Sequence, residues 1–289
     1  MRLPAVAIAS LLALPFGLAG QDFDDIQISR TQVAPAMYML QGSGGNIGLS
    51  IGDDGALIVD DQFGPLTEKI VAAIGELTDK PVEYVINTHF HYDHTDGNEN
   101  FGRLGAAIVA HSNSRDRMLT DQFVRTRPQP AYSADGLPEI TFDQAVSVHF
   151  NGQTIDIFHL GRAHTDGDAV VYFREANVIH TGDVFVRYGL PFIDLGNGGS
   201  LQGMIRFVDA ISQVINDDTA VIPGHGAVST RQDVVEYAVM LRTIRDRVQV
   251  QIDEGSTLQQ IIESDPTEGF GPGDPADFVT NAFNSLSPR

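Results

Sequence analysis

A short segment of the chain, residues 88–94, concentrates side chains that bind metal ions. It reads Thr-His-Phe-His-Tyr-Asp-His and follows residues 82–87, whose β-branched and aromatic side chains predict a buried strand. The loop offers four potential ligands, which are His89, His91, Asp93 and His94. Because successive side chains of a loop point in different directions, the first two could bind one metal ion while the last two face a second. Nitrogen and oxygen ligands of this kind suit zinc or iron better than calcium or magnesium.

The alternative is a polar surface loop that is rich in histidine without binding anything. Against it, two further histidines lie in separate glycine-flanked loops, His164 within residues 161–168 and His225 within Pro-Gly-His-Gly at 223–226. Asp183 follows the strand-like residues that end at His180 and adds a carboxylate. Each of these signals is weak or moderate alone, but together they favour a metal site.

The elements that must position these residues follow a regular order. Hairpin strands come first, then helices, then more hairpins and a second set of helices. We expect strands at 37–40, 46–50, 56–60, 82–87, 106–110, 145–150, 154–160, 169–173, 178–180 and 220–222, and helices at 66–77, 112–119, 200–215, 231–252 and 258–263. Two sheets packed face to face with helices outside, and a site along one shared edge, satisfy this order.

Three segments lack a clear periodic pattern. Residues 21–36 are expected to form an irregular lead-in, and the Gly/Pro-rich tail after Asp265 is expected to be loosely ordered. Residues 120–138 contain several prolines and glycines, which is typical either of a binding lid or of a surface excursion. The resulting division is 1–20 signal peptide, 21–36 lead-in, 37–252 main domain and 253–289 C-terminal helix and tail.

Composition indicates a globular protein that is exported. The chain has 289 residues with 42% hydrophobic and 19% charged content, enough for a full core. A basic start, an apolar stretch and small residues near position 20 predict a signal peptide over 1–20, with an uncleaved anchor as the alternative. The chain has no cysteine, which suits an exported protein and removes thiolate from the possible ligands. The expected location is the periplasm or the exterior.

The net charge of −20 argues against nucleic acid and anionic lipid as partners. We therefore expect a small-molecule substrate, no nucleic acid, and no membrane contact after signal removal. The oligomeric state is left open.

The motifs resemble those of metallo-β-lactamase superfamily hydrolases. The family pattern is His-x-His-x-Asp-His, then a lone His, then Asp or Cys, then Gly-His, and it extends here over residues 37–252. The resemblance implies an α+β fold, the αββα four-layer metallo-β-lactamase sandwich, with a dinuclear site at one sheet edge. It implies a first metal ion held by His89, His91 and His164, a second held by Asp93, His94 and His225, and Asp183 bridging both, as in the glyoxalase II-like members. Two zinc ions per chain are expected, with iron as the alternative.

Two divalent ions close together can share a hydroxide that is nucleophilic at neutral pH. Asp93 would orient that hydroxide and pass a proton to the leaving group. Asp60 is assigned the orientation of a ligand histidine, with a strand-end turn residue as the alternative. The remaining side chains of this kind are interpreted as structural or supporting: His111, His149, His159, His180, Asp166 and Asp168.

The chain departs from the B1 β-lactamases in several places. They have a cysteine at the position of Asp183 and, three residues later, a lysine that binds the substrate carboxylate; here Val186 stands there, with Arg187 next to it as a possible substitute. Their apolar flap corresponds here to the short, polar segment 41–46. Asn197, in a segment resembling exported lactamase-like members, is either an oxyanion donor or a turn residue.

These features predict an exported hydrolase that uses a metal-bridging hydroxide to cleave a lactam- or ester-like carbonyl substrate, with weak or promiscuous β-lactamase activity as one form. The second hypothesis is a thioesterase of glyoxalase II type, disfavoured by the export signal. The third is an iron-dependent oxidoreductase of the persulfide dioxygenase kind, disfavoured by the complete two-metal residue set. A metal-binding module without catalysis is the fourth.

Overall fold

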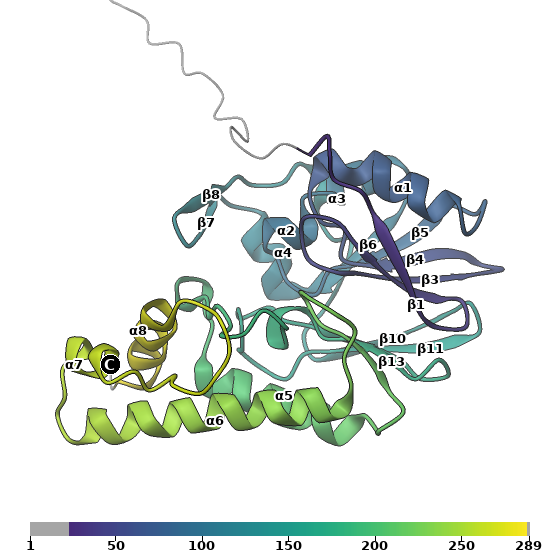
Figure 1. Ribbon diagram of the computed structural model, residues 1–289. Coiled ribbons are helices and arrows are strands. Elements are labelled where there is room, and N and C mark those ends of the chain that lie inside the picture. Colours follow the sequence, from purple (N-terminus) through teal and green to yellow (C-terminus); the bar gives the residue numbers. More distant parts are fainter. Residues whose placement is uncertain (1–22, 288–289) are drawn as a thin grey trace, which may run out of the picture.

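Two β-sheets lie face to face between layers of helices in the computed structural model, which describes residues 23–287 (Figure 1). The first sheet has the strand order β1-β2-β3-β4-β5-β6-β9. Its strands are β1 Ser29–Ala34, β2 Met37–Gln41, β3 Ile47–Gly52, β4 Gly55–Val59, β5 Val82–Ile86, β6 Ala107–His111 and β9 Ile140–Phe142. The second sheet has the order β10-β11-β12-β13-β14. Its strands are β10 Ala145–Phe150, β11 Gln153–Phe158, β12 Val170–Phe173, β13 Val178–His180 and β14 Ala220–Ile222.

The two faces of each sheet pack into different cores, which explains why the central strands are apolar on both sides. Every residue of β4 is buried. Its Leu57 and Val59 point into the core between the sheets, whereas Ala56 and Ile58 join the core beneath the outer helices. The expected four-layer α+β sandwich is therefore confirmed.

Helices cover both outer faces. Against the first sheet pack α1 Thr67–Gly75 and α3 Asn98–Arg103, and against the second pack α5 Leu201–Val214 and α6 Arg231–Asp253. Two short helices follow the strands of the first sheet, α2 Tyr92–Thr95 and α4 Ser112–Met118. The longest helix, α6, begins with a capping box between Thr230 and Asp233, which satisfies the first free amide groups of the helix.

The end of the chain is more ordered than the sequence suggested. After α7 Leu258–Glu263 comes α8 Pro275–Leu286, where a loosely ordered tail was expected. Asp274 caps α8 and Pro275 occupies its first turn, and the side chains of Phe278, Val279 and Ala282 are buried in the core that α5 and α6 share. The expectation was wrong because the glycines and prolines of the preceding segment mask the apolar spacing of this helix.

Two other segments also contain regular structure. β1 lies inside the expected irregular lead-in and pairs antiparallel with β2. Within residues 120–138, β7 Gln122–Val124 and β8 Arg127–Gln129 form a small hairpin, which Figure 1 shows standing apart from both sheets. The predicted signal peptide, 1–20, lies outside the described residues. Among residues 23–287, no helix combines the length and the apolar character needed to cross a membrane.

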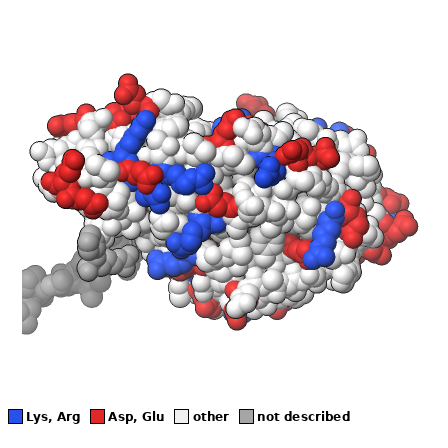
Figure 2. Space-filling model, turned by 90° about the horizontal axis from the view of Figure 1, so that it is seen from below, with Lys and Arg blue, Asp and Glu red and all other residues white. Residues whose placement is uncertain are grey.

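Acidic and basic side chains are interspersed on the face that carries α6. Figure 2 shows this face from below, with basic side chains next to acidic ones. Three arginines of α6 form ion pairs there, Arg231 with Asp217, Arg242 with Asp209 and Arg245 with Asp246. The described part of this face therefore does not present one sign of charge alone.

Truncating Phe278 tests whether α8 is integral to the fold. Its side chain is 2% exposed, so Phe278→Ala should leave a cavity and lower the free energy of unfolding by about 3–5 kcal/mol. Urea denaturation of the variant measures this change. Asn284→Ala, at an exposed position of the same helix, is the control and should change the stability little. A loss for Phe278→Ala no larger than that of the control would contradict the packing role of α8.

Candidate metal centre

The direction of the strands brings the candidate residues to one edge of the sandwich. β4 and β5 run parallel, so Asp60 after β4 and the 88–94 loop after β5 emerge at the same edge of the first sheet. In the second sheet β13 and β14 are parallel, so Asp183 and His225 also share an edge. The loop that carries His164 joins β11 to the antiparallel β12 at that same edge. Residues far apart in the sequence thus meet because they follow strands of like direction.

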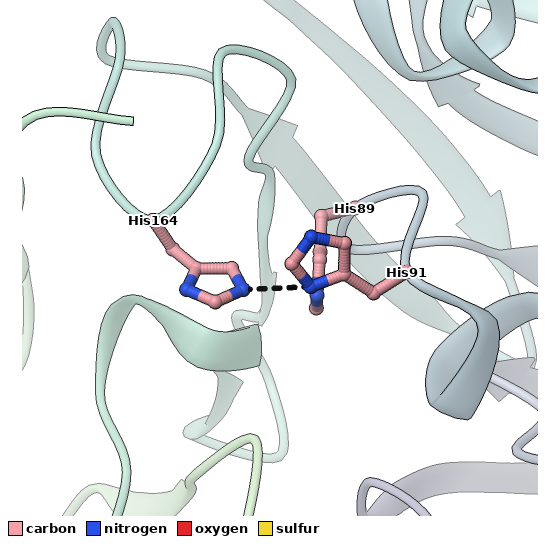
Figure 3. Close-up of side chains that lie close together, drawn as sticks. All are labelled: His89, His91 and His164. Carbon is pink, nitrogen blue, oxygen red and sulfur yellow. Dashed lines mark hydrogen bonds between the residues drawn. The ribbon is translucent and has the colours of Figure 1, made fainter. Parts of the chain in front are cut away.

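Three imidazoles form the first donor group. Figure 3 shows His89, His91 and His164 side by side, with the last residue reaching across from the second sheet. The His164 Nε2 atom lies 3.0 Å from the His91 Nδ1 atom, and one nitrogen of each ring lies within 4.8 Å of the others. All three side chains are buried. This is the set that the resemblance assigned to the first metal ion.

The second donor group combines nitrogen and oxygen atoms. Asp93, His94 and His225 place one ligand atom each within 4.8 Å of one another. Asp183 lies between the groups: its Oδ1 atom is 3.3 Å from His94 Nε2, and its Oδ2 atom is 3.7 Å from His164 Nε2. The carboxylate therefore lies near histidines of both groups, and one of its oxygen atoms also forms a candidate site with His89 and His94.

Two glycines allow this crowding. A Cβ atom on Gly224 would lie 2.0 Å from the Asp183 Oδ1 atom, and one on Gly45 would lie 2.2 Å from the His94 ring. The absence of a side chain at each position is what lets the backbone approach the donors so closely. Gly224, in the glycine-flanked loop of His225, thus makes room for Asp183, and Gly45 makes room for His94.

The buried carboxylate of Asp60 orients the second group. Its Oδ2 atom accepts a hydrogen bond from His94 Nδ1 at 2.7 Å and another from the Thr88 hydroxyl at 2.8 Å. The same hydroxyl lies 3.0 Å from His89 Nδ1. These contacts leave the Nε2 atoms of both histidines directed at the cluster. The contact expected between Asp60 and a candidate ligand is present.

Asp194 orients a histidine of the first group, as Asp60 does in the second. It was not among the residues predicted from the sequence. Its Oδ2 atom lies 2.9 Å from His91 Nε2 across 103 positions of sequence. His164 is oriented by the carbonyl oxygen of Phe192, which lies 2.8 Å from its Nδ1 atom. The only local signal for Asp194 is its place three residues before Asn197, whose backbone amide and side chain both bond to its carboxylate.

The donor set fits a divalent metal ion. The buried Nε2 atom of His89 makes no hydrogen bond to any residue in 23–287, and the buried Oδ1 atom of Asp183 faces the Nε2 atoms of His94 and His225 at 3.3 and 3.4 Å. An unpartnered polar atom is costly in a protein interior, and metal coordination would satisfy the His89 nitrogen and neutralise the Asp183 carboxylate. Neutral imidazoles and carboxylates are the ligands that zinc and related divalent ions accept.

The two donor groups contain residues whose pKa values are shifted in different directions. Burial lowers the pKa of His89 and His91, and in each case a neighbouring imidazole lowers it further, so these two imidazoles are held neutral. Burial also lowers the pKa of His225, but the charge of Asp183 and hydrogen bonds to Asp183 and Asp93 outweigh it and raise the pKa to about 9. Burial raises the pKa of Asp93, yet the charges of His94 and His225 lower it to about 2. The second group therefore holds a proton at neutral pH that a metal ion must displace.

Two candidate residues take positions other than those expected. The guanidinium of Arg187 pairs with Asp233 at the start of α6, at 3.0 Å, instead of pointing into the cluster. The side-chain amide of Asn197 donates to Asp194 at 2.7 Å and to the carbonyl oxygen of Phe123 at 2.8 Å. Both amide hydrogens are thus in use, and Asn197 supports Asp194 instead of serving as an oxyanion donor.

Three of the residues interpreted as supporting, His111, His180 and Asp168, have structural partners. His180 Nε2 lies 2.9 Å from the carbonyl oxygen of Asn46, and His111 caps α4 by accepting a hydrogen bond from the Asn113 amide. Asp168 caps the loop of His164 through the amide and hydroxyl groups of Thr165. These contacts agree with the supporting roles predicted for them.

Much of the chain matches a known protein family. The model of the metallo-β-lactamase superfamily matches residues 40–228. A hydroxyacylglutathione hydrolase from Pelagibacter ubique (strain HTCC1062) is 27% identical over 143 residues, which cover 47% of this chain and 51% of that protein. The aligned part thus spans about half the length of this relative.

Solved structures with similar folds include a metallo-β-lactamase from Pontibacter korlensis, with a TM-score of 0.62 and 19% identity, covering 75% of this chain and 99% of that one. The stereoselective inverting sec-alkylsulfatase Pisa1 from Pseudomonas sp. has a TM-score of 0.68 and 16% identity, covering 90% of this chain and 50% of that one. At such identities the likeness concerns the fold alone.

Replacing Asp194 tests its orientation of His91. Asp194→Asn removes the charged acceptor at almost constant size, and we expect the affinity for zinc to fall about 10–100-fold. Competition with a chromophoric chelator measures the affinity. Asp217→Asn, at a side chain that is 90% exposed, is the control. An affinity for the Asp194 variant equal to that of the control would contradict the assignment.

The raised pKa of His225 predicts how the metal-free protein responds to pH. Because the folded-state pKa of about 9 exceeds the ordinary value of 6.5, the stabilisation is complete below pH 6.5 and is lost as the pH rises through 9. Urea denaturation in the presence of a chelator should show a loss of about 3 kcal/mol between pH 6 and pH 9.5. His225→Gln should show a smaller loss, and equal losses would show that another group is responsible.

Proposed function

Because the chain belongs to the metallo-β-lactamase superfamily, we propose that it is a metal-dependent hydrolase that cleaves ester-like or lactam-like carbonyl substrates. One observation carries this proposal. Asp183 lies between two donor groups, with His94 and His225 at 3.3 and 3.4 Å on one side and His164 at 3.7 Å on the other. A single metal ion would need only one of these groups, so their adjacency supports a pair of ions.

The two groups would hold the ions as the sequence pattern implies. His89, His91 and His164 would hold one, Asp93, His94 and His225 the other, and Asp183 both. Divalent ions supply Lewis-acid chemistry in such a site and lower the pKa of bound water towards neutrality. Zinc suits these ligands, and iron is the alternative.

Asp93 is the residue to which we assign proton transfer. Its Oδ2 atom lies 3.3 Å from His225 Nε2 and 3.8 Å from His94 Nε2, so it belongs to the donor cluster. Its side chain is 24% exposed, whereas Asp60 and His94 are fully buried. Asp93 can therefore meet both water and substrate. It would accept a proton from the attacking water and deliver it to the leaving group.

A thioesterase of glyoxalase II type is the second candidate. The hydroxyacylglutathione hydrolase relative favours it, although the alignment covers only about half of that protein. The predicted signal peptide points instead to export to the periplasm or the exterior, away from a cytosolic thioester. A thioester and an activated ester differ mainly in the leaving atom, so one set of residues could act on both.

Purification without chelators followed by elemental analysis tests the metal assignment. Two zinc ions per chain are expected. Nitrocefin, an activated phenyl ester and a thioester should then be compared as substrates. Turnover of the lactam or ester supports the proposal, and turnover of the thioester alone favours the second candidate. One iron ion per chain together with oxygen consumption would replace the hydrolase by an oxidoreductase.

Asp93→Asn tests the proposed proton transfer. The substitution keeps the size of the side chain but removes its basicity, and we expect kcat/KM to fall at least about 100-fold. Initial rates on the best substrate measure this, with metal content determined for each preparation. Asp217→Asn serves again as the control and should keep the native rate. A variant that keeps both its metal ions and its rate would exclude Asp93 from the chemistry.

A further inference from the structure

Two aromatic side chains flank the candidate ligands, one beside each donor group. The Phe192 ring stacks against the His91 ring, with centroids 6.2 Å apart, and lies 5.8 Å from the His164 ring. The Tyr188 ring lies 5.7 Å from the His225 ring and is 40% exposed. A substrate that reaches the metal centre would therefore contact an aromatic surface beside each donor group.

The hairpin β7–β8 adds a positive charge to this surface. The guanidinium of Arg125, at the hairpin turn, lies 4.2 Å from the centroid of the Phe192 ring. Its side chain is 53% exposed, and its NH1 atom pairs with Asp277 of α8 at 3.1 Å. We call Arg125, Tyr188 and Phe192 the rim of the site. The ion pair engages one nitrogen of the guanidinium, and the group remains open to solvent.

Arg125 is connected to the donor cluster through Phe192. Its guanidinium lies over one ring, and that same ring stacks against His91. A molecule that extends from the cluster along Phe192 would therefore meet this guanidinium.

Arg125 lies in the two-residue turn of the hairpin. Its φ angle is +56°, as tight hairpin turns require. The chain as a whole carries a net charge of −20, so its overall electrostatic potential is negative. An exposed cation beside the site makes the potential there locally more positive.

From these contacts we propose that the rim selects substrates that carry an anionic group, such as a carboxylate, joined through an apolar or aromatic body to the scissile carbonyl. Arg125 binds the anion, and Phe192 and Tyr188 pack against the apolar body. A guanidinium offers the forked donors that match a carboxylate. This inference rests on the proposed function, because it assumes that the scissile group lies at the metal centre.

Arg127 provides the matched control. It lies on the same hairpin, but its guanidinium is 3.9 Å from the centroid of the Tyr92 ring and 5.9 Å from that of Phe63, away from the rim. Asp277 provides a second control. Asp277→Asn breaks the ion pair with Arg125 but keeps the guanidinium, so it separates anchoring of the hairpin from binding of the anion.

The test uses two substrates that differ only in charge, the mono-4-nitrophenyl ester of terephthalic acid and its N-methylamide, with the metal-loaded protein. Arg125→Gln should raise KM for the carboxylate about tenfold, while kcat for both esters and KM for the amide remain unchanged. Arg125→Lys should recover part of the loss. Arg127→Gln and Asp277→Asn should leave the preference for the carboxylate intact.

Equal changes for both substrates, or the same loss in Asp277→Asn, would show that Arg125 only anchors the hairpin and would overturn the proposal. If the native protein hydrolyses neither ester, the proposed function fails on these esters, but the rim remains testable. Calorimetric titration with 4-phenylbutyrate and 4-phenylbutyramide then decides. Weaker binding of the carboxylate alone in Arg125→Gln supports the rim, and unchanged binding of both refutes it.

Discussion

A single buried carboxylate, that of Asp60, connects the two parts of the first sheet that form the metal centre. It has no exposed surface, and it accepts hydrogen bonds from the Thr88 amide at 2.7 Å, the Thr88 hydroxyl at 2.8 Å and His94 Nδ1 at 2.7 Å. Burying a carboxylate is costly unless its oxygen atoms are satisfied in this way. The backbone of Asp60 has a φ angle of +64°, a conformation that costs further energy. The conformation of Asp60 thus depends on its hydrogen bonds with Thr88 and His94.

The same constraint relates stability to metal binding. Burial and neighbouring imidazoles keep His89 and His91 of the first donor group neutral, whereas in the second group Asp183 and Asp93 raise the pKa of His94 and His225. Loss of the protons on these two histidines would leave the two carboxylates without a compensating charge. A divalent ion would supply that charge and would also satisfy the His89 Nε2 atom, which has no hydrogen bond to the described residues. Binding free energy would in this way contribute directly to folding.

The sequence predicted the parts of the site whose signals are local. The 88–94 motif follows a strand, and Asp60, His164, Asp183 and His225 each end or follow one, so sheet geometry alone brings them together. Asp194 could not be found in this way, because it contacts His91 across 103 positions and does not directly follow a strand. α8 could have been found, since Asp274 and Pro275 are a helix-start signal and apolar residues follow at helical spacing. The composition of the preceding segment outweighed that signal.

Two arginines, Arg187 and Arg125, show why the direction of a side chain could be learned only from the structure. Arg187 is close to His225 in the chain's packing, since its amide donates to the His225 carbonyl oxygen at 2.9 Å, yet its guanidinium pairs with Asp233. Arg125 is distant in sequence from every candidate ligand but lies over Phe192. The segment beyond residue 228, where the family match ends, helps to hold this arrangement: the Leu190 amide donates to the Pro272 carbonyl oxygen at 3.0 Å, and Asp277 pairs with Arg125. The candidate metal ligands therefore lie within the range of the family match, whereas the segment beyond it contacts Arg125 and Leu190.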